Sequence, residues 1–245
     1  MTQPTTVVPR PQSVTGAGLT HQGTVRERNE DAILTDPTGA LWAVADGLGG
    51  HGYGDLASAM VIDALSTIPD CGDPPHSLLT RLRAANAAVH RHAEASGTMG
   101  ATVVALMIAR GCGHVAWVGD SRAYLWRRGH LRLLTRDHSV VQDMVASGAL
   151  SPEAAREHPD AHVVTRAIGA EPEVEIDLTT VRLTGGDRLL LCSDGLAGCL
   201  HDQWICERLG EALDAEAACR AMLADALEVG ASDNVSLIVV CIGDG

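Results

Sequence analysis

Four apolar runs with an aspartate at one end are the feature that most constrains how this chain folds. Asp46, Asp120 and Asp194 each follow such a run, and Asp233 precedes another. The runs have the length and apolar character of buried strands, and a carboxylate at a strand end is fixed by the sheet while facing an open rim. Strand ends that meet at one rim would gather carboxylate oxygens, the ligands that Mg²⁺ and Mn²⁺ prefer. The sequence therefore predicts an all-oxygen metal site.

The pattern of elements predicts two stacked sheets. Strands are expected at 14–21, 31–36, 40–45, 101–109, 114–118, 122–126, 131–134, 174–182, 187–192 and 234–242. Helices are expected at 52–67, 75–95, 137–147, 151–157, 202–212 and 214–229. Most strands follow one another directly, so antiparallel pairing is expected. Two sheets packed face to face, with the two blocks of helices outside, would bury every apolar face.

Local signals support these boundaries. Residues 127–130 are typical of a hairpin turn between two strands. Ser151 followed by Pro152 indicates a helix start, and Asp214 and Gly230 fit the two ends of the last helix.

The domain organisation is simple. The 245 residues are 46% hydrophobic, enough for one large core or at most two small ones. Residues 1–13 are interpreted as a disordered N-terminal tail without the apolar region of a signal peptide. Residues 14–245 are expected to form one domain, with an inserted flap at 137–170.

The charge balance excludes several classes of protein. The net charge of −13 argues against a nucleic-acid surface and fits a protein that concentrates divalent cations. All 18 basic residues are arginine, which excludes a Schiff-base lysine, a phosphate-loop lysine and a kinase-type lysine. There is no apolar run of about 18 residues, so no membrane span is expected.

The seven cysteines include no C-x-x-C pair. They are interpreted as buried small hydrophobes in a reducing compartment, which predicts a cytoplasmic location and neither a zinc site nor a disulfide scaffold.

A glycine motif offers an alternative that we disfavour. Gly47, Gly49 and Gly52 form a G-x-G-x-x-G after a predicted strand, as in dinucleotide-binding folds. However, Asp46 would put negative charge next to a pyrophosphate, and the β–helix–β alternation of that fold is missing downstream. A tight turn at Gly47 would instead let its carbonyl face the same ion as Asp46.

The charged cluster at 26–31 is either a solvated turn or part of the site. In the functional interpretation one arginine fork binds a phosphate, and the acidic residues orient metal-bound water. Beside Asp233, Asn234 is expected to brace its own loop by side-chain hydrogen bonds.

Histidines and serines give weaker signals. No histidine pair has the spacing of a metal site, and His51, His158 and His162 all remain open as proton donors. Ser121 and Ser193 stand beside candidate metal ligands without a histidine base nearby in sequence, which argues against a serine nucleophile.

Short motifs in a fixed order resemble the metal-dependent PPM (PP2C-type) protein serine/threonine phosphatases in their short bacterial form. The resemblance covers about residues 14–243. The motifs lie at 26–31, 44–51, 99–102, 119–124, 135–138, 164–169, 192–196 and 232–235.

The resemblance implies an α+β fold, a four-layer α-β-β-α sandwich with the metal centre at one end of two antiparallel sheets. It implies two core Mg²⁺ or Mn²⁺ ions and a weaker third. Asp46 would bridge the core ions, and the Gly47 carbonyl would bind the first. Asp194 and Asp233 would bind the second, and Asp120 would hold the third together with Asp194.

Other residues take supporting roles by the same resemblance. Arg26 would bind the substrate phosphate, while Glu30 and Asp31 would act through water. Leu48 replaces a histidine that eukaryotic members place after Asp-Gly, so the identity of the general acid stays open. Ala101 replaces a common threonine, interpreted as a packing change.

The predicted function is hydrolysis of phosphoserine and phosphothreonine in proteins by water activated between two metal ions, without a covalent phospho-enzyme. The expected partners are phosphoproteins, including a Ser/Thr protein kinase or its substrates, with neither nucleic acid nor membrane. A monomer is the default. Two alternatives are a pseudophosphatase that binds phosphoproteins without turnover and an enzyme for a small phosphorylated metabolite.

Overall fold

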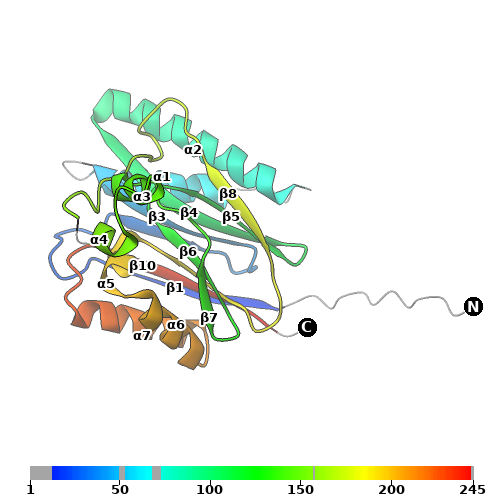
Figure 1. Ribbon diagram of the computed structural model, residues 1–245. Coiled ribbons are helices and arrows are strands. Elements are labelled where there is room, and N and C mark those ends of the chain that lie inside the picture. The colour runs from blue at the N-terminus through cyan, green and yellow to red at the C-terminus, as the bar shows by residue number, and fades with distance from the viewer. Residues whose placement is uncertain (1–12, 50–52, 68–72, 157, 244–245) are drawn as a thin grey trace, which may run out of the picture.

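Two five-stranded antiparallel sheets form the centre of the computed structural model (Figure 1). The structure describes residues 13–49, 53–67, 73–156 and 158–243. One sheet runs in the order β1 (Val14–His21), β10 (Val235–Ile242), β9 (Arg188–Cys192), β6 (Arg122–Arg127) and β7 (His130–Leu133). The other runs in the order β2 (Asp31–Thr35), β3 (Leu41–Gly49), β4 (Met99–Ala109), β5 (Cys112–Val118) and β8 (Asp177–Arg182).

Helices cover the outer face of each sheet. The long helices α1 (Gly54–Ser66) and α2 (Pro74–Ser96) pack on the β2–β8 sheet. The opposite outer face carries α5 (Asp194–Cys199), α6 (Asp202–Glu211) and α7 (Ala215–Glu228). The predicted four-layer α-β-β-α sandwich is therefore confirmed.

Strand alternation explains the layers. In β3, Ala43 and Ala45 face the helices, whereas Trp42 and Val44 face the second sheet. Successive side chains of a strand point to opposite faces, so a strand that is apolar at every position is buried on both. The uninterrupted apolar runs noticed in the sequence are thus the strands between two cores.

Most predicted elements match the structure within a few residues. The turn at 127–130 joins β6 to β7, with Arg127 opposite His130. Ser151 accepts a hydrogen bond from the Ala154 amide, and Asp214 accepts one from Ala217, so both helix caps are confirmed.

Two local predictions are wrong. The strand expected to stop at residue 45 continues to Gly49, because the backbone beyond Asp46 keeps pairing with β4 and Gly47 donates to the Glu30 carbonyl. Asp46 is therefore inside a strand and not at its end. The six-residue helix α5 was also missed, since Asp194 and Gly195 have the local character of a turn.

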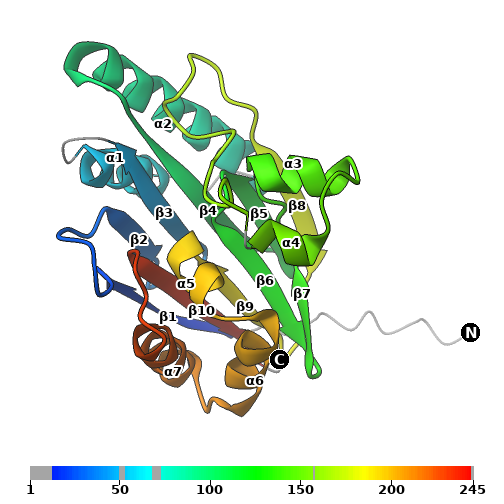
Figure 2. The ribbon, with the colours of Figure 1, turned by 60° about the vertical axis from the view of Figure 1, so that its left-hand side comes forward.

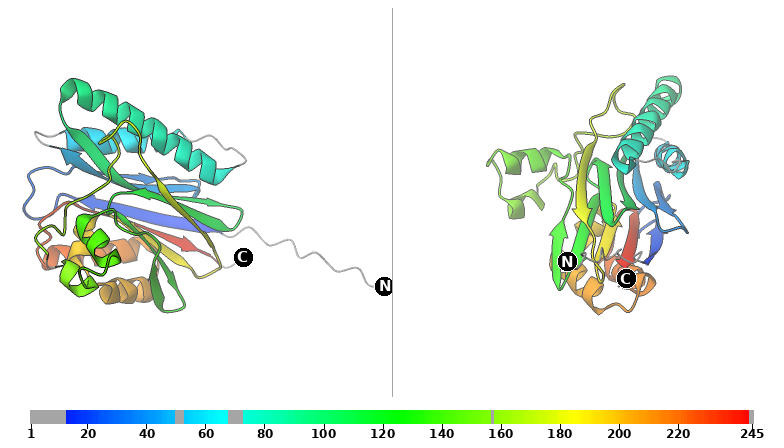
Figure 3. Two further views of the ribbon diagram at one scale, coloured as in Figure 1. Left: turned by 45° about the horizontal axis from the view of Figure 1, so that its top comes forward. Right: turned by 90° about the vertical axis from the view of Figure 1, so that its right-hand side faces the viewer.

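Residues 137–170 carry two short helices, α3 (Val140–Ala146) and α4 (Pro152–Arg156), that project from the sandwich (Figure 3). Figure 2 shows the pair beside β6, outside the two helical layers. At the base, His138 joins both ends of the segment to the body. Its amide donates to Gly119, its carbonyl accepts from Thr165, and its Nδ1 accepts from the Gly119 amide at 3.0 Å.

Some of the sequence predictions fall on residues outside the described ranges. Residues 1–12 of the predicted tail, together with His51, Gly52 and Cys71, lie outside the described residues. The other six cysteines are free thiols. Within the described ranges, no helix has the length and apolar character needed to cross a membrane.

Candidate metal centre and active site

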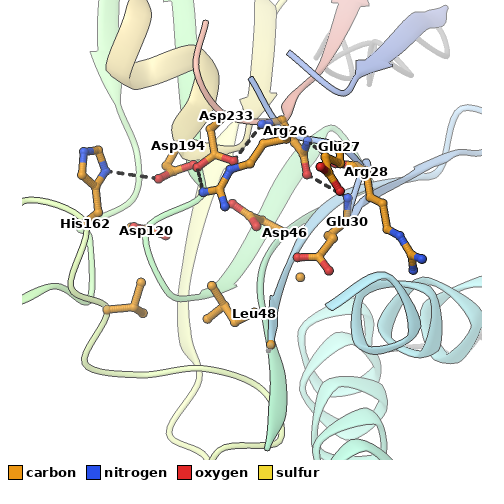
Figure 4. A pocket seen from close by; sticks show the side chains of 14 residues that line it. Arg26, Glu27, Arg28, Glu30, Asp46, Leu48, Asp120, His162, Asp194 and Asp233 are labelled. Carbon is orange, nitrogen blue, oxygen red and sulfur yellow. Dashed lines mark hydrogen bonds and ion pairs between the residues drawn. The ribbon is translucent and has the colours of Figure 1, made fainter. Parts of the chain in front are cut away.

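One open pocket of about 590 Å³ collects most of the predicted site residues (Figure 4). It lies at one end of the sandwich, where elements of both sheets meet. The lining consists of Arg26, Glu27, Arg28, Glu30, Asp46, Gly47, Leu48, Gly49, Asp120, His162, Val164, Asp194, Asp233 and Asn234.

The four predicted aspartates reach this pocket from different elements. Asp46 belongs to β3, and Asp120 lies in the turn between β5 and β6. Asp194 is the first residue of α5, directly after β9, and Asp233 precedes β10. Carboxylates separated by up to 187 positions in sequence therefore line one cavity, as the motif pattern predicts.

Two glycines are required by close backbone contacts beneath these aspartates. A Cβ on Gly47 would lie 2.1 Å from the Gly54 carbonyl oxygen. A Cβ on Gly195 would lie 2.0 Å from the Asn234 carbonyl oxygen. The Asp-Gly pairs therefore keep neighbouring backbone segments close behind Asp46 and Asp194, and any larger residue would force these segments apart.

Asn234 braces the loop that carries Arg26 and Glu30. Its Nδ2 donates to the carbonyls of Gln22 at 3.0 Å and Arg28 at 2.9 Å. Its Oδ1 accepts from the Glu30 amide at 2.8 Å. These three bonds tie the 22–30 loop to the start of β10, a contact between distant segments that the sequence did not predict.

Asp31 lies behind the pocket as the strand partner of Asp46. Its Oδ2 accepts from the Ser193 hydroxyl at 3.0 Å, whereas its buried Oδ1 has no protein partner among the described residues. Burial raises its pKa to about 6 against the opposing bonds from Ser236 and Ser193, with repulsion from Asp194 and Asp233 adding to the rise. The region thus holds more negative charge than its protein partners balance.

The same excess affects Asp46 and Asp120. Burial, followed by repulsion from Asp31 and Asp194, raises the pKa of Asp46 well above its ordinary value. Burial, and then repulsion from Asp194 and Asp137, raises the pKa of Asp120 to about 7. Carboxylates that destabilise each other's ionised forms favour the binding of a cation between them.

Arg26 is the cation nearest to this cluster. Its Nη2 donates to Asp233 Oδ2 at 2.7 Å, and its side chain is 57% exposed at the pocket edge. The hydrogen bond and charge of Asp233 raise the pKa of Arg26. Figure 4 shows the guanidinium among Asp46, Asp194 and Asp233.

His162 is the candidate proton donor that the structure brings to the pocket. Its Nδ1 lies 3.6 Å from Asp194 Oδ2, and this contact raises the pKa of the imidazole. His158, four residues earlier, is absent from the lining, and His51 lies outside the described residues. Leu48 and Val164 add apolar surface that the sequence analysis did not assign to the site.

The pocket fits a hard cation by ligand type. It is lined by carboxylates and by Gly47, and its acidic groups raise one another's pKa values. The ligand set is nevertheless open, since within the described part of the chain no three His, Cys, Asp or Glu side chains are gathered closely enough to enclose an ion. Asp233 is turned to Arg26 instead. Ion binding would therefore need small movements of these side chains.

Comparison with known families agrees with this geometry. The model of the family described as protein phosphatase 2C matches residues 16–236. The chain therefore belongs to the protein phosphatase 2C family, and the resemblance found in the sequence is confirmed. The dinucleotide-binding alternative is wrong, because every strand pair in the described residues is antiparallel.

Curated relatives carry phosphatase names. The serine/threonine protein phosphatase PstP of Mycobacterium tuberculosis is 38% identical over 93% of this chain, which spans 45% of the length of PstP. The serine/threonine phosphatase stp of Listeria welshimeri is 33% identical over 90% of this chain and 93% of its own length.

A solved structure of a phosphatase domain has the same fold. The catalytic domain of a PstP in complex with two manganese ions matches with a TM-score of 0.88 and 34% identity, over 96% of this chain and all of that domain. That protein holds two ions of one of the metals that the sequence analysis expects.

Proposed function

We propose that this chain is a metal-dependent protein phosphatase that hydrolyses phosphoserine and phosphothreonine in proteins. The observation that carries the proposal is the pocket in which Asp46, Asp120, Asp194 and Asp233 surround Arg26, in a chain of the protein phosphatase 2C family. The PstP catalytic domain with its two manganese ions supports the metal requirement.

We assign the metal ligands as the sequence analysis does. Asp46, the Gly47 carbonyl, Asp194 and Asp233 would hold two Mg²⁺ or Mn²⁺ ions, and Asp120 would hold a weaker third with Asp194. When bound, such ions neutralise phosphate charge and lower the pKa of water. The buried, mutually repelling carboxylates supply the negative charge for this purpose.

Arg26 would orient the phosphate. Its bond to Asp233 uses Nη2, and a guanidinium has five N–H donors in a planar fork. It therefore keeps donors for two phosphate oxygens while it holds Asp233. Because its side chain is largely exposed, it is free to follow the substrate.

Three residues would hold the site in place without binding the substrate. Asn234 fixes the loop of Arg26. Oδ1 of Asp31, which has no partner among the described residues, is available to accept a hydrogen bond from water. Glu30 stands at the pocket wall, where burial raises its pKa. Such residues orient water and ligands without touching the substrate.

A covalent phospho-enzyme is disfavoured by the surroundings of each nearby nucleophile. The Ser193 hydroxyl is fully buried and donates to Asp31, and the buried Ser121 hydroxyl bonds to Thr102. Burial raises the pKa of Cys192 to about 12, so this thiol stays protonated at neutral pH. The surroundings of these three side chains therefore favour direct attack by water.

The partners and the cellular location are less constrained. Phosphoproteins are the substrate class that the family supports, and a Ser/Thr protein kinase or its substrates are our finer proposal. Cytoplasmic location and a monomeric state stay predictions from the sequence.

A single assay series tests the proposal. Chelator-treated protein should be inactive toward p-nitrophenyl phosphate and a phosphothreonine peptide, and Mn²⁺ or Mg²⁺ should restore both activities. Loss of the peptide activity alone would favour a small metabolite as substrate. Full binding of phosphopeptide without any turnover would favour the pseudophosphatase.

A further inference from the structure

A second groove opens directly off the metal pocket. It has a volume of about 370 Å³ and lies between the α3–α4 segment on one side and α5, β6 and β7 on the other. Asp120, His162 and Asp194 line both cavities. A chain whose phosphorylated residue lies over the metal pocket can therefore continue into the groove without leaving the protein surface.

Seven of the residues that line the groove have apolar side chains. Leu133 of β7 is 40% exposed, although most large apolar side chains of the described residues are buried. The apolar lining residues are Leu133, Val141, Val145, Pro152, Ala155, Ala161 and Ala197. An apolar surface that faces a cavity next to an active site is a candidate contact for an apolar ligand group.

Apart from Asp120, His162 and Asp194, which the groove shares with the metal pocket, the charged residues of the groove are paired with each other. Arg122 donates from Nε and Nη2 to both carboxylate oxygens of Asp137, at 2.7–3.1 Å. Arg156 of α4 bonds to His201 at 2.6 Å and lies 3.9 Å from Asp202. These pairs leave little unmatched charge to attract a charged side chain, in contrast to the acidic metal pocket.

The Arg156 contacts also limit the groove. They connect the C-terminal end of α4 to the start of α6. The groove thus adjoins the metal pocket, has apolar residues in its walls and is bridged where α4 meets the start of α6. This shape fits one or two side chains and not a whole folded partner.

We propose that this groove binds an apolar side chain of the phosphoprotein substrate, located close in sequence to the phosphorylated residue. The inference rests on the proposed function and adds a substrate class to it, namely phosphorylated segments with a neighbouring apolar residue. Burying one such side chain accounts for about a tenfold difference in kcat/KM.

The test uses phosphothreonine peptides in which Leu, Ala or Glu is placed at each position on either side of the phosphorylated residue. Wild-type protein with Mn²⁺ should prefer Leu at one or two positions on one side by about tenfold over Glu. p-Nitrophenyl phosphate serves as the reference, because it has no side chain to place in the groove. The readout is the ratio of kcat/KM for peptide to kcat/KM for this reference.

Two variants from opposite walls, Leu133→Glu and Val145→Glu, should each lower that ratio about tenfold for the Leu peptide. Leu133→Arg should do more than weaken the preference. It should shift the favoured residue at the same position from Leu to Glu, which a merely structural role of Leu133 would not produce. The matched control is Leu213→Glu, a change at a leucine that is 94% exposed and remote from the groove, and its ratio should equal that of wild type.

The outcomes separate this inference from the proposed function. No metal-dependent hydrolysis of either compound would refute the function itself. Hydrolysis of both with equal rates for Leu, Ala and Glu peptides, or an unchanged ratio in both wall variants, would refute the groove proposal alone. Concentration-dependent self-association that Leu133→Glu abolishes would assign the groove to a second copy of the chain and also refute it.

Discussion

The two ends of β9 carry aspartates in opposite surroundings. Asp187, just before the strand, accepts two bonds from Arg127 at 2.7 Å and one from the Thr184 amide at 2.7 Å. Burial alone would raise its pKa, but these bonds outweigh burial and lower it. Asp194, just after the strand, instead faces Asp46 and Asp120, whose pKa values are raised.

This difference separates a structural carboxylate from a functional one. Asp187 is matched by an arginine and an amide of its own fold, so its charge needs nothing further. The carboxylates around Asp194 exceed the cations available to them among the described residues, where Arg26 is paired with Asp233 and His162 lies beside Asp194. An arrangement that the protein does not balance internally is one that a ligand of opposite charge stabilises.

The largest expected effect is on catalysis. Asp194→Asn or Asp46→Asn should lower kcat/KM for a phosphothreonine peptide by more than about a hundredfold, since losing even a residue that supports a metal ligand costs about 10–100-fold. Steady-state kinetics over a range of Mn²⁺ concentrations measures this. Near-normal activity in either variant would refute the ligand assignment.

The opposite end of the strand supplies the matched control and the next effect. Asp187→Asn should keep most of the activity but lower the free energy of unfolding by about 1–2 kcal/mol, because it weakens a charge-assisted pair whose arginine is partly exposed to solvent. Urea denaturation of chelator-treated protein measures the change. Loss of activity without loss of stability in Asp187→Asn would contradict the contrast drawn between the aspartates at the two ends of β9.

Arg26 should have a smaller, substrate-dependent effect. Arg26→Ala should raise KM for the phosphopeptide about tenfold with a smaller change in kcat, because it removes charge-assisted bonds to the phosphate. Arg28→Ala is the comparison, since Figure 4 shows its side chain directed away from the aspartates. Equal KM values for Arg26→Ala and wild type would show that Arg26 pairs with Asp233 but does not bind the substrate phosphate.

The smallest expected signal is in the pH dependence of stability without divalent ions. The pKa of Asp120 rises from 3.8 to about 7 on folding, so the folded state keeps a proton that the unfolded chain has released between these values. The free energy of unfolding should therefore fall as the pH rises through this window. Asp120→Asn should make this slope less steep, by an amount that corresponds to less than one bound proton. The stabilisation that Asp187 contributes through its lowered pKa should be lost only as the pH falls below about 4. A slope that is identical in Asp120→Asn would contradict the raised pKa of Asp120.

Much of the fold was predictable because local pattern and burial agree. The apolar strands, the hairpin at 127–130 and the caps at Ser151 and Asp214 each depend on a few neighbouring residues. The strand order within each sheet was not predictable from local pattern, because pairings such as β1 with β10 join distant segments. Helix α5 was missed for the same reason, since the close contact of Gly195 with Asn234 is tertiary.

The site was predictable in its residues but not in its surroundings. The motifs pointed to the four aspartates and Arg26 that line the pocket. The pairing of Arg26 with Asp233 and the position of His162 depend on how the 137–170 segment and the 22–30 loop lie over the pocket, which no spacing in the sequence specifies. The groove beside Leu133 likewise arises only when the projecting segment stands opposite α5.

Anomalous X-ray scattering from crystals grown with Mn²⁺ tests the central claim most directly, namely that the unbalanced carboxylates at one end of the sandwich bind divalent ions. We expect at least two manganese peaks in the pocket, bordered by Asp46, the Gly47 carbonyl, Asp194 and Asp233, and none beside Asp187. Crystals of enzyme with Mn²⁺-dependent activity whose anomalous map shows no manganese between these residues would contradict the account.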